Sequence, residues 1–184
     1  MREKDIVEFV KKEVEPLPPL SPYGVRYRVA ATLTDDIYLP CVVIESAART
    51  VDLAIKRFDQ TRNATNSGRG MGYRDIVKTF VTGGNSVNHY DLHALSLSPF
   101  AIPLARMKEI GGETSMGWTE FYATMQDGQE FRFGTTFCTE FFSMPESYIC
   151  SDITKIIPAV RGEKPKSEKI YREKPFFTCF VDGL

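Results

Sequence analysis

The chain has 184 residues, of which 42% are hydrophobic, 12% aromatic and 26% charged, and its formal net charge is −1. This length and composition are typical of one globular domain with a sizeable apolar core. No apolar run reaches the roughly 18 residues of a membrane span, and no basic-then-apolar pattern opens the chain, so we expect neither a membrane segment nor a signal peptide. The cysteines are widely spaced, which predicts reduced thiols and a cytoplasmic location; they are Cys41, Cys138, Cys150 and Cys179.

The first predicted element is an amphipathic helix over residues 5–15, within an N-terminal helical segment 1–15. Its apolar residues recur at helical spacing: Ile6, Phe9, Val10 and Val14. Pro16 ends this helix, because proline disfavours the helical conformation of the residue before it. Residues 16–23 hold four prolines and predict a stiff, extended connector to the first strand.

Two strands and two helices are predicted next. Residues 25–29 alternate cleanly and residues 37–44 return as a more continuously apolar strand, in which Pro40 indicates an edge position or a bulge. Ser46 is a plausible N-cap for a helix that runs to about residue 62. The apolar stripe predicted to be buried on that helix consists of Val51, Ala54, Ile55 and Phe58. Residues 63–72 form a glycine-rich loop, and residues 73–81 resume a short helical pattern.

The second half of the chain is predicted to be mainly strands. These are residues 88–97, 104–110, the hairpin within 118–137, and 176–181, with a short helix over 151–157. The charged segment 161–175 has few apolar residues and predicts an extended or mobile loop. The expected fold is a single α+β domain over 1–184, with a bent, mainly antiparallel sheet of about five to seven strands and two helices on one face.

The hairpin at Asp127-Gly128 is the clearest local signal, because this pair favours the tight turns that join antiparallel strands. A two-residue turn would place Trp118 and Tyr122 in the core. A three-residue loop with a bulge at Gly128 would instead put the phenylalanines on one face and the polar side chains, with Trp118 and Tyr122, on the other. The cleaner separation of apolar from polar residues favours the bulged register.

Both histidines of the chain lie in one short segment. His89, Asp91 and His93 would share one face of a strand, so they are candidate catalytic residues, or ligands of a zinc or iron ion. Their spacing matches no specific metal signature, and no cofactor is predicted. Structural or surface histidines remain the plainer interpretation.

The loop over 67–74 carries three glycines together with Arg69 and Arg74. Glycines let backbone N–H groups converge on an anion, and arginine adds direct phosphate contacts. The loop follows a predicted helix and lacks the Lys-Ser/Thr of a P-loop, so a surface connector is the alternative. Arg69, Arg74, Trp118 and Tyr122 are therefore the candidate ligand-binding residues.

Charge is unevenly distributed along the chain. Residues 49–78 hold seven basic and three acidic residues, whereas residues 109–152 hold eight acidic residues against Arg132 alone. Such segregation is compatible with a homodimer in which acidic and basic regions meet, or with a basic face that binds phosphates or nucleic acid. Solvated faces with no partner are the plainer alternative. The chain's pI near 6.2 makes nucleic-acid binding the least favoured class.

The sequence thus predicts a cytoplasmic binding or interaction protein that is not an enzyme. Its ligand or partner surface is expected near the aromatic hairpin and the glycine-rich loop. The alternative is an enzyme that uses His89, Asp91 and His93, with or without a metal, on a phosphorylated or other anionic small molecule. A weak nucleic-acid binder is the third hypothesis.

Overall fold

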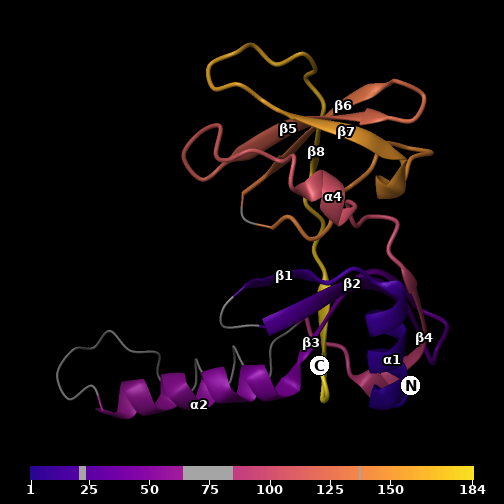
Figure 1. Ribbon diagram of the computed structural model, residues 1–184, viewed down its shortest axis with the longest axis vertical. Helices are drawn as coiled ribbons and strands as arrows, with labels where there is room; N and C mark the ends of the chain where they lie inside the picture. The colour runs from indigo at the N-terminus through magenta and orange to yellow at the C-terminus, as the bar shows by residue number, and fades with distance from the viewer. Residues whose placement is uncertain (21–23, 64–84, 137) are drawn as a thin grey trace.

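The computed structural model describes residues 1–20, 24–63, 85–136 and 138–184. Its strands form two sheets, one of five strands and one of four, which lie one above the other (Figure 1). Most of the strand pairs are antiparallel, and helices are few, so the predicted α+β class is confirmed. The strands divide between two sheets, where the sequence had predicted one bent sheet.

The first sheet is built around β2 (Gly24–Leu33). This strand pairs along one edge with β3 (Tyr38–Ser46) and along the other with β1 (Leu17–Leu20) and β4 (Leu92–Leu97). The fifth strand, β9 (Phe177–Val181), runs parallel to β3. The register of β2 with β3 shifts beside Pro40, as the bulge prediction required, and the pairing with β9 begins only at Val42.

Helix α1 (Glu3–Glu13) covers one face of this sheet and confirms the predicted N-terminal helix. Ile6 and Val10 are fully buried against Tyr27, Val29 and Ile44. Alternation along β2 and β3 sends Arg26, Arg28 and Glu45 to the opposite face, which is turned toward the second sheet. The side of the sheet that α1 leaves free therefore carries buried charges.

The second sheet has the order β7-β5-β6-β8, with β5 (Thr119–Met125), β6 (Glu130–Thr135), β7 (Ile153–Pro158) and β8 (Ile170–Arg172). In the β5–β6 hairpin Phe121 faces Phe133, and Gly128 has a φ of +86°. The bulged register is therefore confirmed. One face is apolar and holds Phe121, Ala123, Met125 and Phe133 in the core, whereas Trp118, Glu120 and Tyr122 lie on the other.

Two predicted elements were wrong. Residues 104–110 contain no strand but a one-turn helix, α4 (Leu104–Met107), because Pro103 starts a turn in which its carbonyl accepts from the N–H groups of Arg106 and Met107. Residues 151–157 form no α-helix. A 3-10 turn, η3 (Cys150–Asp152), leads there into β7, whose four β-branched residues favour the extended conformation.

Helix α2 (Ala47–Asn63) forms as predicted but does not bury the expected stripe. Val51 and Ile55 are each 55% exposed, because most of the helix extends beyond the edge of the first sheet (Figure 1). The predicted helix over 73–81 lies outside the described residues. None of the described helices has the length and hydropathy needed to cross a membrane.

Candidate ligand-binding cleft

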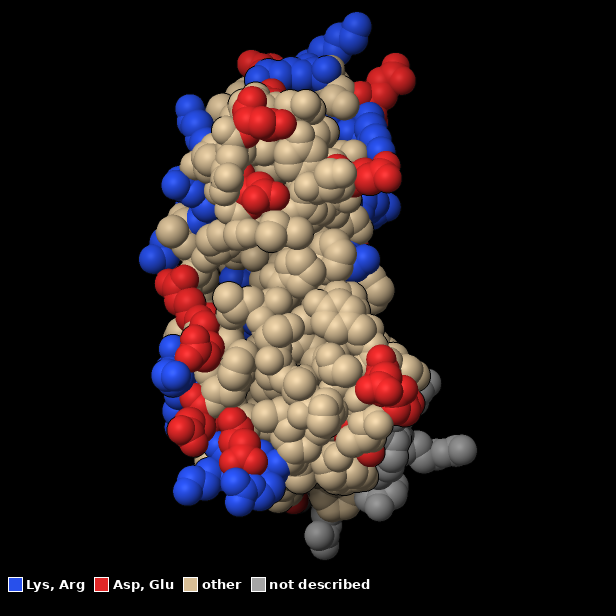
Figure 2. Space-filling view, turned by 90° about the vertical axis from the view of Figure 1, so that its right-hand side faces the viewer, with Lys and Arg blue, Asp and Glu red and all other residues tan. Residues whose placement is uncertain are grey.

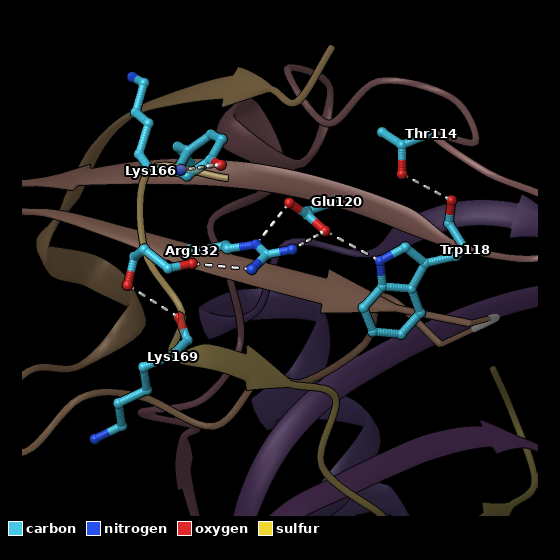
Figure 3. Close-up of polar contacts among 8 residues, drawn as sticks. Thr114, Trp118, Glu120, Arg132, Lys166 and Lys169 are labelled. Carbon is cyan, nitrogen blue, oxygen red and sulfur yellow. Dashed lines mark hydrogen bonds and ion pairs between the residues drawn. The ribbon is translucent and has the colours of Figure 1, made fainter. Parts of the chain in front are cut away.

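The polar face of the second sheet presents a row of interacting side chains. Trp118 lies just before β5, Glu120 and Tyr122 lie on β5, and Arg132 lies on β6 directly opposite Tyr122. Figure 3 shows Glu120 between Arg132 and the indole of Trp118. The strand period of two brings these residues to one face, away from the phenylalanine core.

Glu120 and Arg132 form a bidentate ion pair. Arg132 Nε lies 2.6 Å from Glu120 Oε1, and Nη2 lies 2.8 Å from Oε2. The same carboxylate accepts a hydrogen bond of 3.2 Å from Trp118 Nε1. The hydrogen bonds from Arg132 and Trp118 lower the pKa of Glu120, although its partial burial opposes this shift. The pair therefore keeps its charges and sets the orientation of the indole.

Residues 159–169, here called the strap, cross this polar face. The backbone N–H of Lys166 donates to the Tyr122 hydroxyl (3.2 Å), and Arg132 Nη1 donates to the Ser167 carbonyl (2.9 Å). The ammonium of Lys166 lies 5.0 Å from the centre of the Tyr122 ring and 2.9 Å from Glu130. These contacts attach the C-terminal part of the strap to the hairpin and leave Tyr122 only 7% exposed.

A cleft of about 190 Å³ remains between the strap and the sheet. Its floor is formed by Trp118, Glu120, Tyr122 and Arg132, and Thr114 and Ser115 lie at one end. The side chains around it include four basic residues, Arg132, Arg161, Lys164 and Lys166, against the acidic Glu120 and Glu163. Arg132 is paired with Glu120, and Lys166 is paired with Glu130. Arg161 and Lys164 against Glu163 then leave the cleft with a small positive charge.

Two further neighbours fix the position of the Trp118 indole. The guanidinium of Arg172 on β8 lies 5.0 Å from the centre of the Trp118 ring. Gly134 on β6 lets the ring lie directly on the backbone, since a Cβ atom there would stand 2.2 Å from Trp118 Cζ2. The half-buried Trp118 is thus a fixed wall of the cleft.

The lowered pKa of Glu120 predicts a specific pH dependence. A carboxyl group whose pKa is lower in the folded protein stabilises it above the unfolded pKa, and this stabilisation is lost as the pH falls through the folded pKa. We expect Glu120→Gln to be less stable than the wild type at neutral pH, and the difference to shrink in acid below pH ~4. Urea denaturation of both proteins at several pH values measures this. A difference that stays constant with pH would show that the charge of Glu120 does not contribute.

The three residues of the predicted histidine site make separate contacts. His89 lies in the 3-10 helix η2 (His89–Asp91), where its Nδ1 is 3.4 Å from the Met1 carbonyl and its Nε2 is 3.8 Å from Glu3. Asp91 accepts a hydrogen bond from Asn88, and His93 is exposed on β4. No group of three or more His, Cys, Asp or Glu side chains in the described ranges is arranged to hold a metal ion.

The cysteines of the chain are free, as expected, and their surroundings do not favour nucleophilic chemistry. Burial raises the pKa of Cys41 to about 11 and the pKa of Cys150 and Cys179 to about 12. A thiol acts as a nucleophile in its thiolate form, so these three side chains are poor candidates for catalysis.

Of the predicted ligand-binding residues, Trp118 and Tyr122 line the cleft, whereas Arg69 and Arg74 lie outside the described residues. The basic strap was missed as part of the site. Its only sequence signal was a charged segment with few apolar residues, which had indicated a loop. Within the segment 161–175, which was predicted to be an extended or mobile loop, residues 170–172 form β8.

Half of the acidic residues in the stretch 109–152 are neutralised within the chain. Four of its carboxylates form ion pairs with basic residues of the same molecule: Glu109 with Arg106, Glu120 with Arg132, Glu130 with Lys166, and Glu140 with Arg26. This leaves fewer unpaired acidic groups for a second copy of the chain. The homodimer remains a prediction.

Comparisons with family models, with curated proteins and with solved structures found no match. Function must therefore be inferred from the chemistry of the cleft itself.

Proposed function

We propose that this protein is a binding protein that holds a small anion in the cleft between Trp118 and the strap. The positive charge around the cleft is the observation that supports this proposal. Arg161 and Lys164 are exposed at its rim, and neither side chain has an ion pair or hydrogen bond in the described part of the chain. An anion that entered the cleft would supply the partner that these two side chains lack.

The cleft also offers contacts that would orient such a ligand. Trp118 supplies a rigid aromatic surface, and the side-chain hydroxyls of Thr114 and Ser115 lie at the same end. The Thr114 hydroxyl donates to the Trp118 carbonyl (3.1 Å), so its oxygen can still accept a hydrogen bond. A ligand with a phosphate or carboxylate group beside a planar ring would use both the charge and the aromatic wall.

The chain's single tryptophan provides a direct test, because intrinsic fluorescence then reports on Trp118 alone. We expect phenyl phosphate, and more weakly inorganic phosphate, to cause a saturable change in this fluorescence. The double variant Arg161→Gln/Lys164→Gln should bind about tenfold more weakly, since two charge-assisted contacts are lost.

The matched control is Lys4→Gln/Lys12→Gln, which removes the same charge from α1, outside the residues that line the cleft. It should bind as the wild type does. Equal weakening of both double variants would show that only net charge matters. No saturable response in the wild type would remove the proposal altogether.

A further inference from the structure

A second pocket lies where the two sheets meet, and we call it the waist pocket. Its volume is about 360 Å³, which falls in the range of small-molecule sites. The first sheet contributes Arg28 and Leu97, and the upper half of the molecule contributes Leu104 of α4 and Ile149, which precedes η3. Figure 2 shows this side of the molecule, where a largely uncharged surface is hollowed at mid-height.

Arg28 is the unusual member of the lining. It is only 6% exposed, and its guanidinium donates to two backbone carbonyls, those of Glu140 (Nη1, 3.1 Å) and Ile102 (Nη2, 2.7 Å). Its Nε is buried and has no hydrogen-bond partner. Burial lowers the pKa of Arg28 to about 10, as desolvation of a cation requires.

Its neighbour Arg26 shows what Arg28 lacks. Both side chains leave the same face of β2, but Arg26 forms an ion pair of 3.0 Å with Glu140, whereas Arg28 has no ion pair with any carboxylate of the described residues. The carboxylates of Glu140 and Glu15 act on Arg28 from beyond ion-pair distance, and its hydrogen bonds go only to carbonyls. A buried cation without a direct carboxylate partner remains costly. A ligand carboxylate in the waist pocket would therefore stabilise the buried Arg28 cation on its inner wall.

The other walls of the pocket are mainly apolar. The pocket is lined, together with Arg28, by Leu97, Pro99, Ala101, Pro103 and Leu104. Glu15 and Ser151, which are both exposed, complete the lining from the solvent side. A ligand that suits this lining has one negative group and a hydrocarbon body.

We propose that the waist pocket binds a small monocarboxylate with an apolar body, its carboxylate on Arg28 and its hydrocarbon against Leu97 and Leu104. This site is independent of the cleft over Trp118. The Glu15 carboxylate is negatively charged like the ligand and repels it. This repulsion limits the affinity of the waist pocket for anions. Removal of that charge should strengthen binding.

Titration calorimetry with the full chain tests the proposal, with octanoate as the probe. We expect saturable binding of octanoate, and binding of octan-1-ol or octylamine that is at least about tenfold weaker, because neither can neutralise Arg28. Equal affinity for the acid and the alcohol would overturn the role of Arg28. This comparison needs no variant that removes the buried arginine and so risks misfolding.

Three variants of exposed side chains add independent readouts. Glu15→Gln should tighten octanoate binding by about two- to fivefold, and Ser151→Trp should weaken it by narrowing the entrance. The control Arg161→Gln/Lys164→Gln, which alters the cleft, should bind octanoate as the wild type does. Loss of octanoate binding in this control, with no effect of Ser151→Trp, would assign the binding to the cleft and overturn the proposal.

A peptide C-terminus carries the same chemistry. A tetrapeptide that ends in leucine with a free carboxylate distinguishes this source from a small acid. We expect it to bind more weakly than octanoate, since its polar backbone would have to enter an apolar pocket. Tighter binding of the peptide would overturn the assignment to a small molecule.

Discussion

Replacement of Glu140 by alanine is expected to lower the free energy of unfolding by about 3–5 kcal/mol, the usual cost of breaking one side of a buried ion pair. The side chains of Arg26 and Glu140 are only 10% and 12% exposed, and they lie 3.0 Å apart between the two sheets. Without Glu140, the Arg26 cation would remain buried with no carboxylate in ion-pair contact. Urea denaturation followed by circular dichroism measures the loss.

Two comparisons make this prediction specific. Glu8→Ala, on an exposed position of α1, should change stability by less than about 0.5 kcal/mol. The double variant Arg26→Met/Glu140→Met removes both charges and leaves no buried charge unpaired. It should therefore lower the free energy of unfolding by less than Glu140→Ala alone does. A loss below about 1 kcal/mol for Glu140→Ala would mean that Glu45, the residue paired with Arg26 in the sheet register, takes over as its partner.

Gly134→Ala is expected to destabilise the protein by about 1–3 kcal/mol through overpacking. The added Cβ would stand 2.2 Å from Trp118 Cζ2 and 2.7 Å from Ile170 Cδ1. Ile170 can adjust the end of its side chain, but Trp118 must move as a rigid ring, which breaks its hydrogen bond to Glu120. Urea denaturation should show the loss, and the fluorescence maximum of Trp118 should shift to the red as the indole becomes more exposed.

Gly112→Ala is the matched control. A Cβ at Gly112 would meet no atom within 4 Å, so this change should be neutral or slightly stabilising. The effects of Gly134→Ala and Trp118→Leu on the free energy of unfolding should also be non-additive, since the smaller leucine side chain makes room for the new methyl group. Equal effects of the two glycine substitutions would show that the close approach of Trp118 to β6 contributes nothing.

The β5–β6 hairpin shows how much of this fold can be predicted from local sequence. Asp127-Gly128 supplies the turn, and the separation of phenylalanines from polar residues selects one register out of two. Both signals act over fewer than about twenty residues. The position of Trp118 and Tyr122 on the polar face followed from these two signals.

Other elements depend on contacts that a local pattern does not contain. A six- or seven-residue segment such as 104–110 alternates too briefly to distinguish a strand from one turn of helix. The strap illustrates the same limit at the candidate site. Its charges are visible in the sequence, but its place over Tyr122 depends on β8, which pairs with β6 across a long sequence separation.

The parallel pairing of β3 with β9 bears on the order in which the protein folds. Val42 is the register partner of Phe177, so one edge of β3 stays unpaired until well over a hundred further residues have been synthesised. Contacts of such high sequence separation slow folding, because the loop must close before the pair forms. During that interval the nascent chain exposes an apolar strand edge. A chaperone that covers this edge should raise the yield of folded protein more than it would for a protein built from hairpins alone.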